Sequence, residues 1–172
     1  MLFCGIMLNI YTATSSDYPL IQKIAHETWP DTFGAILSKE QISYMLEMMY
    51  STAALTEQTS VKGHQFLLVK DETKHLGYAS FELNYKGLSK TKIHKIYILP
   101  EAQGKGVGKL LMNTVTGIAK ENKNDTLSLN VNRDNSAFAF YQNIGFEKVG
   151  EENIDIGDGF LMEDFIMDKK LV

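Results

Sequence analysis

The chain is poor in cysteine and proline, with one and three respectively among 172 residues. The single cysteine, Cys4, cannot form an internal disulfide, which is typical of the reducing cytoplasm, so we expect a cytoplasmic protein. The net charge of −4 excludes a general nucleic-acid surface, and we expect no nucleic-acid partner. The chain has no long hydrophobic run. Its apolar opening at 1–7 is too short for a bilayer and lacks a basic leader, so we expect no membrane partner.

A chain of this length suits one domain with a sizeable core. The first alternating stretch, at 8–13, is typical of a strand. We therefore expect 1–7 to be an N-terminal extension without function and 8–170 to form a single domain. No repeat, low-complexity run or linker interrupts this domain.

Hydrophobic spacing predicts helices and strands in a mixed order. A cap at 15–17 starts a helix that runs to about Thr28, where Trp29-Pro30 is expected to break it. A capping-box pattern at 38–41 predicts a second helix, and 51–63 fits either a short helix or a loop. We expect the rest to form strands at 65–69 and 75–85, a strand at 92–99, a helix at 105–121, a strand at 127–131, a helix at 135–143 and strands at 146–155 and 160–167. This order predicts a mixed α/β fold.

A glycine-rich turn, Gln103–Gly108, opens directly into an amphipathic helix. Glycines let backbone N–H groups converge, and the helix start adds positive charge, so the segment suits a phosphate or pyrophosphate. The triphosphate loop needs a hydroxyl residue after its lysine, but Leu110 follows Lys109. The dinucleotide fingerprint needs a glycine at position 109 and also fails. A glycine-rich helix start without a ligand is the alternative.

The remaining pattern, Gln-x-x-Gly-x-Gly after Ile96–Pro100, resembles the pyrophosphate loop of the GNAT superfamily, the acetyl-CoA-dependent N-acetyltransferases. The resemblance implies a single-domain fold with a central, mostly antiparallel sheet flanked by helices, and acetyl-CoA as cosubstrate. In that family the strand before the loop aligns the coenzyme through its backbone. The implied coenzyme-binding residues are Tyr97, Ile98, Leu99, Gln103, Gly104, Lys105, Gly106, Val107, Gly108 and Lys109. For the two lysines, a solvated helix position is the alternative.

A second segment, 129–146, resembles the distal GNAT motif, in which an Asn, an Ala and a Tyr lead to Gly-Phe. Many members carry the Asn seven residues before the Tyr, where this chain has Asp134. Asn135 fits a subgroup written Val-Asn-Arg-x-Asn-x-Ala, so the resemblance implies that Asn135 and Tyr141 face the coenzyme. We expect Asp134 to cap the helix instead. With both motifs in order, the resemblance covers about 10–167.

Acetyl transfer to an amine needs a neutral nucleophile and a leaving thiolate that gains a proton. Tyr141 is the candidate proton donor, because the phenol pKa of about 10 is closer to that of a thiol than a carboxylic acid pKa is. His94, where the family often has a Glu, is the candidate base, with an unperturbed pKa of about 6.5. A packed aromatic and a structural histidine are the alternatives. His26, His64 and His75 show no metal-ligand spacing, so we expect no metal.

The N-terminal half of this family usually recognises the substrate. Here Glu-Thr-x-x-Asp-Thr-Phe at 27–33, with Gly157-Asp158, resembles bacterial Pai-type spermidine/spermine acetyltransferases. Carboxylates and aromatic faces can hold a cationic amine, so a polyamine or other small amine is the expected acceptor, acetylated directly in a ternary complex. The candidate substrate-binding residues are Glu27, Trp29, Asp31 and Asp158. For the tryptophan, a hydrophobic lid over the helices is the alternative.

The glycine loop indicates only the donor of the acetyl group and does not determine the acceptor. The acceptor alternatives are a protein N-terminus, a lysine side chain, an amino acid and an aminoglycoside. A non-catalytic acetyl-CoA-binding module is a further alternative from another functional class. Exposed edge strands often support dimers in this family, so a homodimer is one more expectation.

Overall fold

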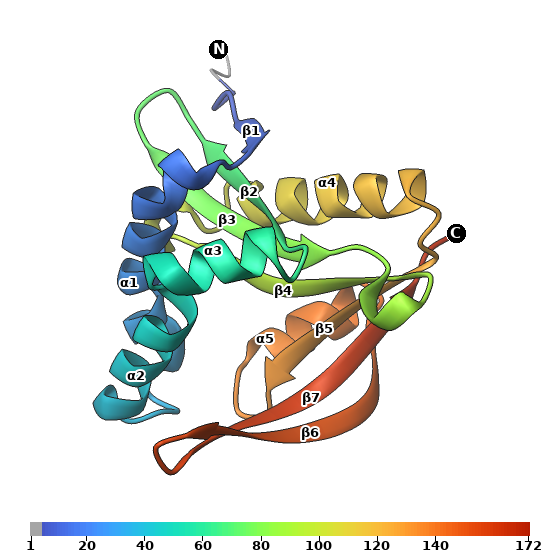
Figure 1. Ribbon diagram of the computed structural model, residues 1–172. Helices are drawn as coiled ribbons and strands as arrows, with labels where there is room; N and C mark the ends of the chain where they lie inside the picture. Colours follow the sequence, from blue (N-terminus) through green and yellow to red (C-terminus); the bar gives the residue numbers. More distant parts are fainter. Residues whose placement is uncertain (1–4) are drawn as a thin grey trace.

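The alternating apolar stretches meet in one seven-stranded sheet, which the computed structural model shows for the described residues, 5–172 (Figure 1). The strand order is β1-β2-β3-β4-β5-β7-β6, and the neighbours are antiparallel except β4 and β5. The strands are β1 (Asn9–Thr12), β2 (Gln65–Lys70), β3 (His75–Glu82), β4 (Lys90–Ile98), β5 (Thr126–Asn132), β6 (Glu147–Gly157) and β7 (Phe160–Lys170). This confirms the mixed α/β fold with a mostly antiparallel sheet.

Helices cover both faces of this sheet (Figure 1). They are η1 (Ser15–Asp17), α1 (Tyr18–Phe33), α2 (Lys39–Tyr50), α3 (Thr52–Ser60), η2 (Tyr85–Gly87), η3 (Pro100–Ala102), α4 (Val107–Glu121) and α5 (Ala137–Asn143), where η marks a 3₁₀ turn. Tyr97 contacts Trp29 of α1, whereas Ile98 borders Gly108 of α4. Because successive strand residues point to opposite faces, α1 and α4 lie on opposite faces of β4.

α1 continues through Pro30, so the break predicted at Trp29-Pro30 is wrong. Its last turn is intact, because the Gly34 N–H donates to the Pro30 carbonyl at 2.8 Å. The Trp29 ring centroid lies 4.8 Å from that of Phe33 and 5.7 Å from that of Tyr97. Both α1 aromatics are buried, and this burial offsets the hydrogen bond that a proline inside a helix cannot donate.

One helix begins later than the sequence predicts, and a segment that the sequence left open holds a helix. α4 begins at Val107 rather than 105, because Gly106 has a φ of +83°, outside the helical region. The segment 51–63 holds α3, whose N-cap Ser51 accepts the Ala54 N–H at 3.2 Å. Of the expected extension at 1–7, residues 1–4, including Cys4, lie outside the described residues, and 5–7 belong to no helix or strand. None of the helices within 5–172 is long and apolar enough to cross a membrane.

β4 and β5 pair over only part of their length. Their parallel ladder joins Lys90–Ile93 to Thr126–Leu129, after which β4 continues without β5 as a partner. On its other side, β4 has a bulge at His94, because Phe81 pairs with Ile93 whereas Ser80 pairs with Lys95. The unpaired half of β4 therefore offers backbone groups to a ligand at the point where the two strands separate.

Candidate active site

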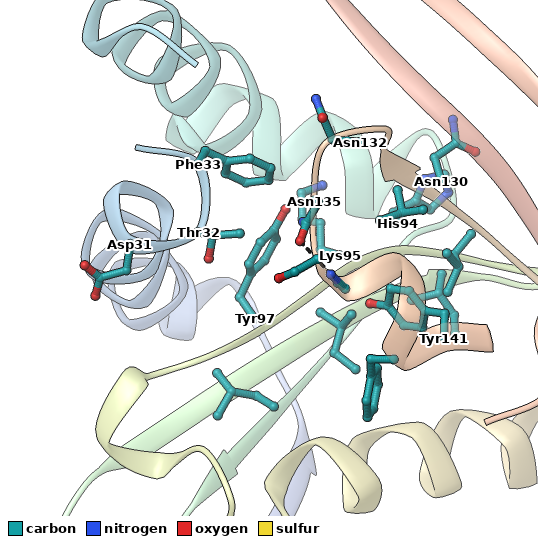
Figure 2. A pocket seen from close by; sticks show the side chains of 18 of the residues that line it. Asp31, Thr32, Phe33, His94, Lys95, Tyr97, Asn130, Asn132, Asn135 and Tyr141 are labelled. Carbon is teal, nitrogen blue, oxygen red and sulfur yellow. Dashed lines mark hydrogen bonds between the residues drawn. The ribbon is translucent and has the colours of Figure 1, made fainter. Parts of the chain in front are cut away.

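The separation of β4 from β5 forms one wall of a cavity of about 740 Å³ (Figure 2). β4, β5, η3 and α5 all contribute residues to its lining. Residues predicted from both motifs, together with the substrate candidate Asp31, line this cavity, namely Asp31, His94, Tyr97, Ile98, Gln103, Asn135 and Tyr141. Leu99, in contrast, is buried with 4% of its surface exposed, and residues 104–109 are not part of the cavity wall.

The glycine loop presents free backbone donors beside this cavity. Gly104 and Gly106 have φ values of +78° and +83°, which only glycine adopts without strain. Gln103 N–H donates to the Pro100 carbonyl, and main-chain bonding resumes where Leu110 N–H donates to the Gly106 carbonyl. Within the described residues, the N–H groups of 104–109 have no main-chain acceptor. This bare helix start is suited to an anion such as a pyrophosphate.

Tyr141 projects from α5 into the wall of the same cavity, and Figure 2 shows its hydroxyl facing the open space. Its ring packs edge-on against Phe140 and Phe146, at centroid distances of 5.5 and 5.7 Å. Burial raises the pKa of Tyr141 to about 12, so the hydroxyl keeps its proton at neutral pH. The residue is both a packed aromatic and an available hydrogen-bond donor.

Asn135 lies where α5 begins. Its Oδ1 accepts the Ala137 N–H at 2.9 Å in an Asx turn, the N-cap position of α5 is Ser136, and the cap predicted at Asp134 is wrong. Asp134 instead donates its own N–H to Asn132 Oδ1. In the described part of the chain, Nδ2 of Asn135 has no hydrogen-bond partner and is available to a ligand in the cavity.

His94 lies at the bulge of β4 and is hydrogen-bonded to Glu82, which the sequence analysis did not single out. Its Nε2 is 2.9 Å from Glu82 Oε2, and its ring stacks on His64 with centroids 3.9 Å apart. Burial lowers the pKa of His94 to about 3, and Lys95 and other nearby lysines act in the same direction. His94 is therefore a neutral imidazole at physiological pH.

A second cavity of about 350 Å³ lies against the same part of β4. It shares His94, Lys95 and Tyr97 with the first cavity, and α1, α2, β6 and β7 close it. Lys95 is buried there, donates to Gln58 Oε1 at 2.8 Å, and has its Nζ 5.6 Å from the ring centroid of Tyr50. Burial lowers the pKa of Lys95 to about 8.

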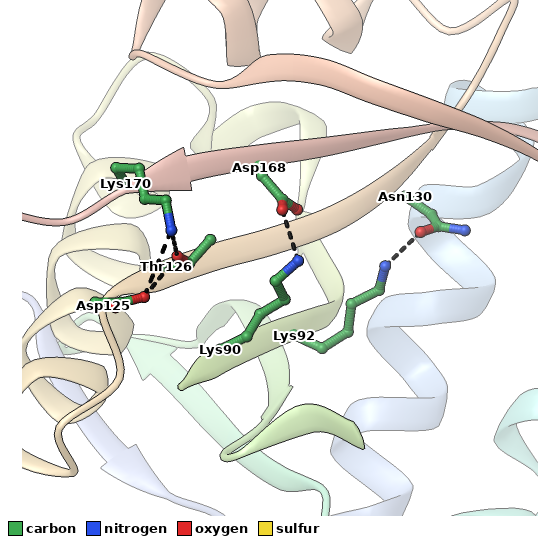
Figure 3. Close-up of polar contacts among 7 residues, drawn as sticks. All are labelled: Lys90, Lys92, Asp125, Thr126, Asn130, Asp168 and Lys170. Carbon is green, nitrogen blue, oxygen red and sulfur yellow. Dashed lines mark hydrogen bonds and ion pairs between the residues drawn. The ribbon is translucent and has the colours of Figure 1, made fainter. Parts of the chain in front are cut away.

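Charges of both signs face this second cavity. Lys92 donates to Asn130, as Figure 3 shows, and Nδ2 of Asn130 donates to Glu152 Oε2 at 2.9 Å. Asp164 lies 3.3 Å from the same Nδ2 and is 4% exposed, and burial raises the pKa of its carboxyl group. Figure 3 also shows Lys90 paired with Asp168 at 2.6 Å. The sequence analysis missed these residues, although lysines inside an otherwise apolar strand are a recognisable signal.

The four candidate substrate residues do not come together. Trp29 lines the second cavity, and Asp31 lines the first. Glu27 lines a separate cavity, beside the ion pair of Lys74 with Glu101. Asp158 lies between β6 and β7, exposed and with a φ of +54°.

Comparisons with known proteins agree with this geometry. A model of the acetyltransferase (GNAT) domain matches residues 35–165. An uncharacterized N-acetyltransferase of Lactobacillus delbrueckii subsp. lactis is 28% identical over 96% of this chain and 98% of that protein. The spermidine N(1)-acetyltransferase of Thermoplasma acidophilum is 27% identical over 95% of this chain and 97% of its own length.

A solved structure extends the likeness to three dimensions. PaiA N-acetyltransferase from Thermoplasma acidophilum, in complex with coenzyme A, matches with a TM-score of 0.79 at 26% identity, over 96% of this chain and 99% of that one. The domain match covers most of the chain, and the fold agrees along nearly all of it. The chain therefore belongs to the GNAT family of acetyl-CoA-dependent N-acetyltransferases.

Proposed function

We propose that this enzyme transfers the acetyl group directly from acetyl-CoA to a small primary amine, with both molecules bound at once. The observation that carries this proposal is that the two cavities share one wall, formed by His94, Lys95 and Tyr97 of β4. A coenzyme in the larger cavity and an amine in the smaller one would meet at this wall. Such an arrangement supports direct attack, since proximity replaces a covalent acetyl-enzyme.

The coenzyme is assigned to the first cavity and the glycine loop. The pyrophosphate lies against the N–H groups of 104–109, and the pantetheine arm follows Tyr97, Ile98 and Leu99 along the side of the chain that faces away from β3 and has no β5 partner. The Asn135 amide has a free donor for the same arm. Lys105 and Lys109 are exposed beside the loop and add positive charge near the phosphates.

Two side chains are assigned to proton transfer. The amine nitrogen attacks the thioester carbon, the carbon–sulfur bond breaks, and the departing thiolate takes the hydroxyl proton of Tyr141. The proton lost by the amine passes to a water in the cavity, and His94, whose Nε2 is held by Glu82, orients that water with its other ring nitrogen rather than keeping the proton, because its pKa is lowered to about 3. Both residues line the first cavity, where the thioester would lie.

A polyamine is the acceptor that we propose first. The Thermoplasma relative is a spermidine N(1)-acetyltransferase, and two carboxylates, Glu152 and Asp164, line the second cavity with the Trp29 ring. These groups suit a cationic chain. An amine that also carries a carboxylate is the second candidate, because Lys92 and Lys95 line the same cavity.

A thiol-release screen tests these assignments. Purified protein with acetyl-CoA is offered spermidine, spermine, amino acids, lysine peptides and aminoglycosides, and free coenzyme A thiol is measured. We expect the highest kcat/KM with a polyamine. A preference for carboxylate-bearing amines would replace that acceptor with the second candidate. Acetyl-CoA binding without thiol release from any amine would contradict the catalytic proposal and favour a binding module.

A further inference from the structure

His64 is a largely buried histidine whose ring has no hydrogen bond to any residue of 5–172. It lies between α3 and β2, and only 9% of its side chain is exposed. Nδ1 is fully buried without a partner, and Nε2 lies 3.7 Å from Glu82 Oε2, beyond hydrogen-bond distance. Nε2, which faces Glu82 without a hydrogen bond, is the ring atom that is open to a ligand.

Glu82 and His94 complete a cluster with this ring. Glu82 Oε2 lies 2.9 Å from Nε2 of His94, and one donor atom from each of the three side chains lies within 4.8 Å of the others. The residues come from the loop before β2, the end of β3 and the bulge of β4. Spacing along the chain therefore could not reveal the cluster, which is why the sequence analysis expected no metal.

We propose that His64, Glu82 and His94 bind a divalent first-row transition metal such as Zn²⁺ or Co²⁺. Two imidazoles and one carboxylate are the ligand types that these ions accept. Bonds of about 2.0–2.2 Å place neighbouring ligand atoms roughly 3–3.5 Å apart, close to the 2.9 and 3.7 Å separations from Glu82. The two rings are stacked at 13° with centroids 3.9 Å apart, so one ring has to turn before both nitrogen atoms point at one ion. All three ligands are within reach of one ion, and water from the second cavity, which both histidines line, can fill the open positions.

Local charge both supports and limits this site. Glu82 contributes a negative charge, whereas Lys62, Lys92 and Lys95 repel a cation. We therefore expect binding weaker than that of a structural zinc site, with only three protein ligands.

Co²⁺ titration of the untagged protein, without acetyl-CoA or amine, tests the proposal. We expect a saturable visible absorption band with one equivalent of metal, displaced by Zn²⁺. His64→Gln and Glu82→Gln should each weaken Co²⁺ binding by more than the about 10-fold that loss of an outer partner costs. His26→Gln, at an exposed histidine outside the cluster, is the matched control and should bind as the wild type does.

Two results of this titration would overturn the metal site. A wild-type protein without a saturable band, or a band that survives in both cluster variants, places no metal at these residues. Wild-type melting temperature with and without Zn²⁺ is a second measurement that needs no variant to fold, and an unchanged value would also overturn the proposal. Because neither readout involves acetyl transfer, the result is independent of the acceptor. It does bear on the role proposed for His94, because a metal held by this ring and Glu82 would replace the hydrogen bond between them.

Discussion

Gly108 and Ile98 are in contact where α4 begins beside the end of β4. A Cβ added at position 108 would lie 2.9 Å from Cδ1 of Ile98, closer than two carbon atoms normally approach. Ile98 also lines the larger cavity. The absence of a side chain at 108 thus lets the glycine loop approach the strand along which we place the coenzyme.

Gly108→Ala should weaken acetyl-CoA binding more than it destabilises the fold. The Ile98 side chain has to leave its rotamer, which shifts the cavity wall, whereas alanine itself favours the helix. We expect a dissociation constant about tenfold higher, equal to about 1.4 kcal/mol, by isothermal titration calorimetry. Gly117→Ala in the same helix, with nothing within 4 Å of its added Cβ, is the control and should leave affinity unchanged. Equal affinity in the two variants would contradict this role for Gly108.

Local sequence patterns predicted the candidate-site residues that lie together in one short, contiguous segment of the chain. Gln103 lies in a strand–turn–helix segment, as do Asn135 and Tyr141, and hydrophobic periodicity was sufficient to place both segments. The structure brings all three residues to the wall of one cavity. Contiguous motifs of this kind carry their own geometry, because the turn and the helix start are encoded within a few residues.

The second cavity could not be predicted in the same way. Its walls come from α1, α2, β4 and the β6–β7 pair, which meet only through the order of strands in the sheet. Glu27 and Asp31 lie four residues apart on α1, yet they line different cavities. Residues four apart share one helix face but lie about 6 Å apart along its axis, so tertiary packing decides which cavity each side chain reaches, and a cluster of acidic and aromatic residues in the sequence does not define one binding surface.

Pro30 shows where tertiary packing outweighs a local rule, and it offers a test of stability. Pro30→Ala restores a backbone N–H in the interior of α1 and removes the clash of the ring with the preceding turn. We expect the free energy of unfolding to rise by about 1–2 kcal/mol in urea titrations, after allowance for the greater flexibility of the unfolded chain. Pro19→Ala, in the first turn of the same helix, should change it by less than about 0.5 kcal/mol. A loss of stability at position 30 would show that the proline ring is needed there.

Glu152→Gln tests whether the second cavity holds a cationic amine. Glu152 lines that cavity and accepts from Asn130, so the substitution removes a negative charge while keeping the shape of the side chain. We expect KM for spermidine to rise about tenfold with little change in kcat, because a charge-assisted contact is worth about 1.5–3 kcal/mol. Glu147→Gln, exposed at the other end of β6, is the matched control. An unchanged KM in both variants would show that the cationic group of the acceptor does not bind at Glu152.

Tyr141→Phe separates a proton donor from a packed aromatic, because phenylalanine keeps the ring contacts with Phe140 and Phe146 and removes only the hydroxyl. General acid catalysis contributes about 10²–10⁴-fold, so we expect kcat to fall by at least about 10²-fold while the acetyl-CoA dissociation constant stays the same. With its pKa raised to about 12, the wild-type hydroxyl holds its proton throughout the neutral range, and kcat/KM should show no loss of this donor up to about pH 10. Tyr11→Phe, on β1 away from both cavities, controls for loss of a phenol. Turnover that survives in Tyr141→Phe would leave the residue a structural role and assign the thiolate proton to water.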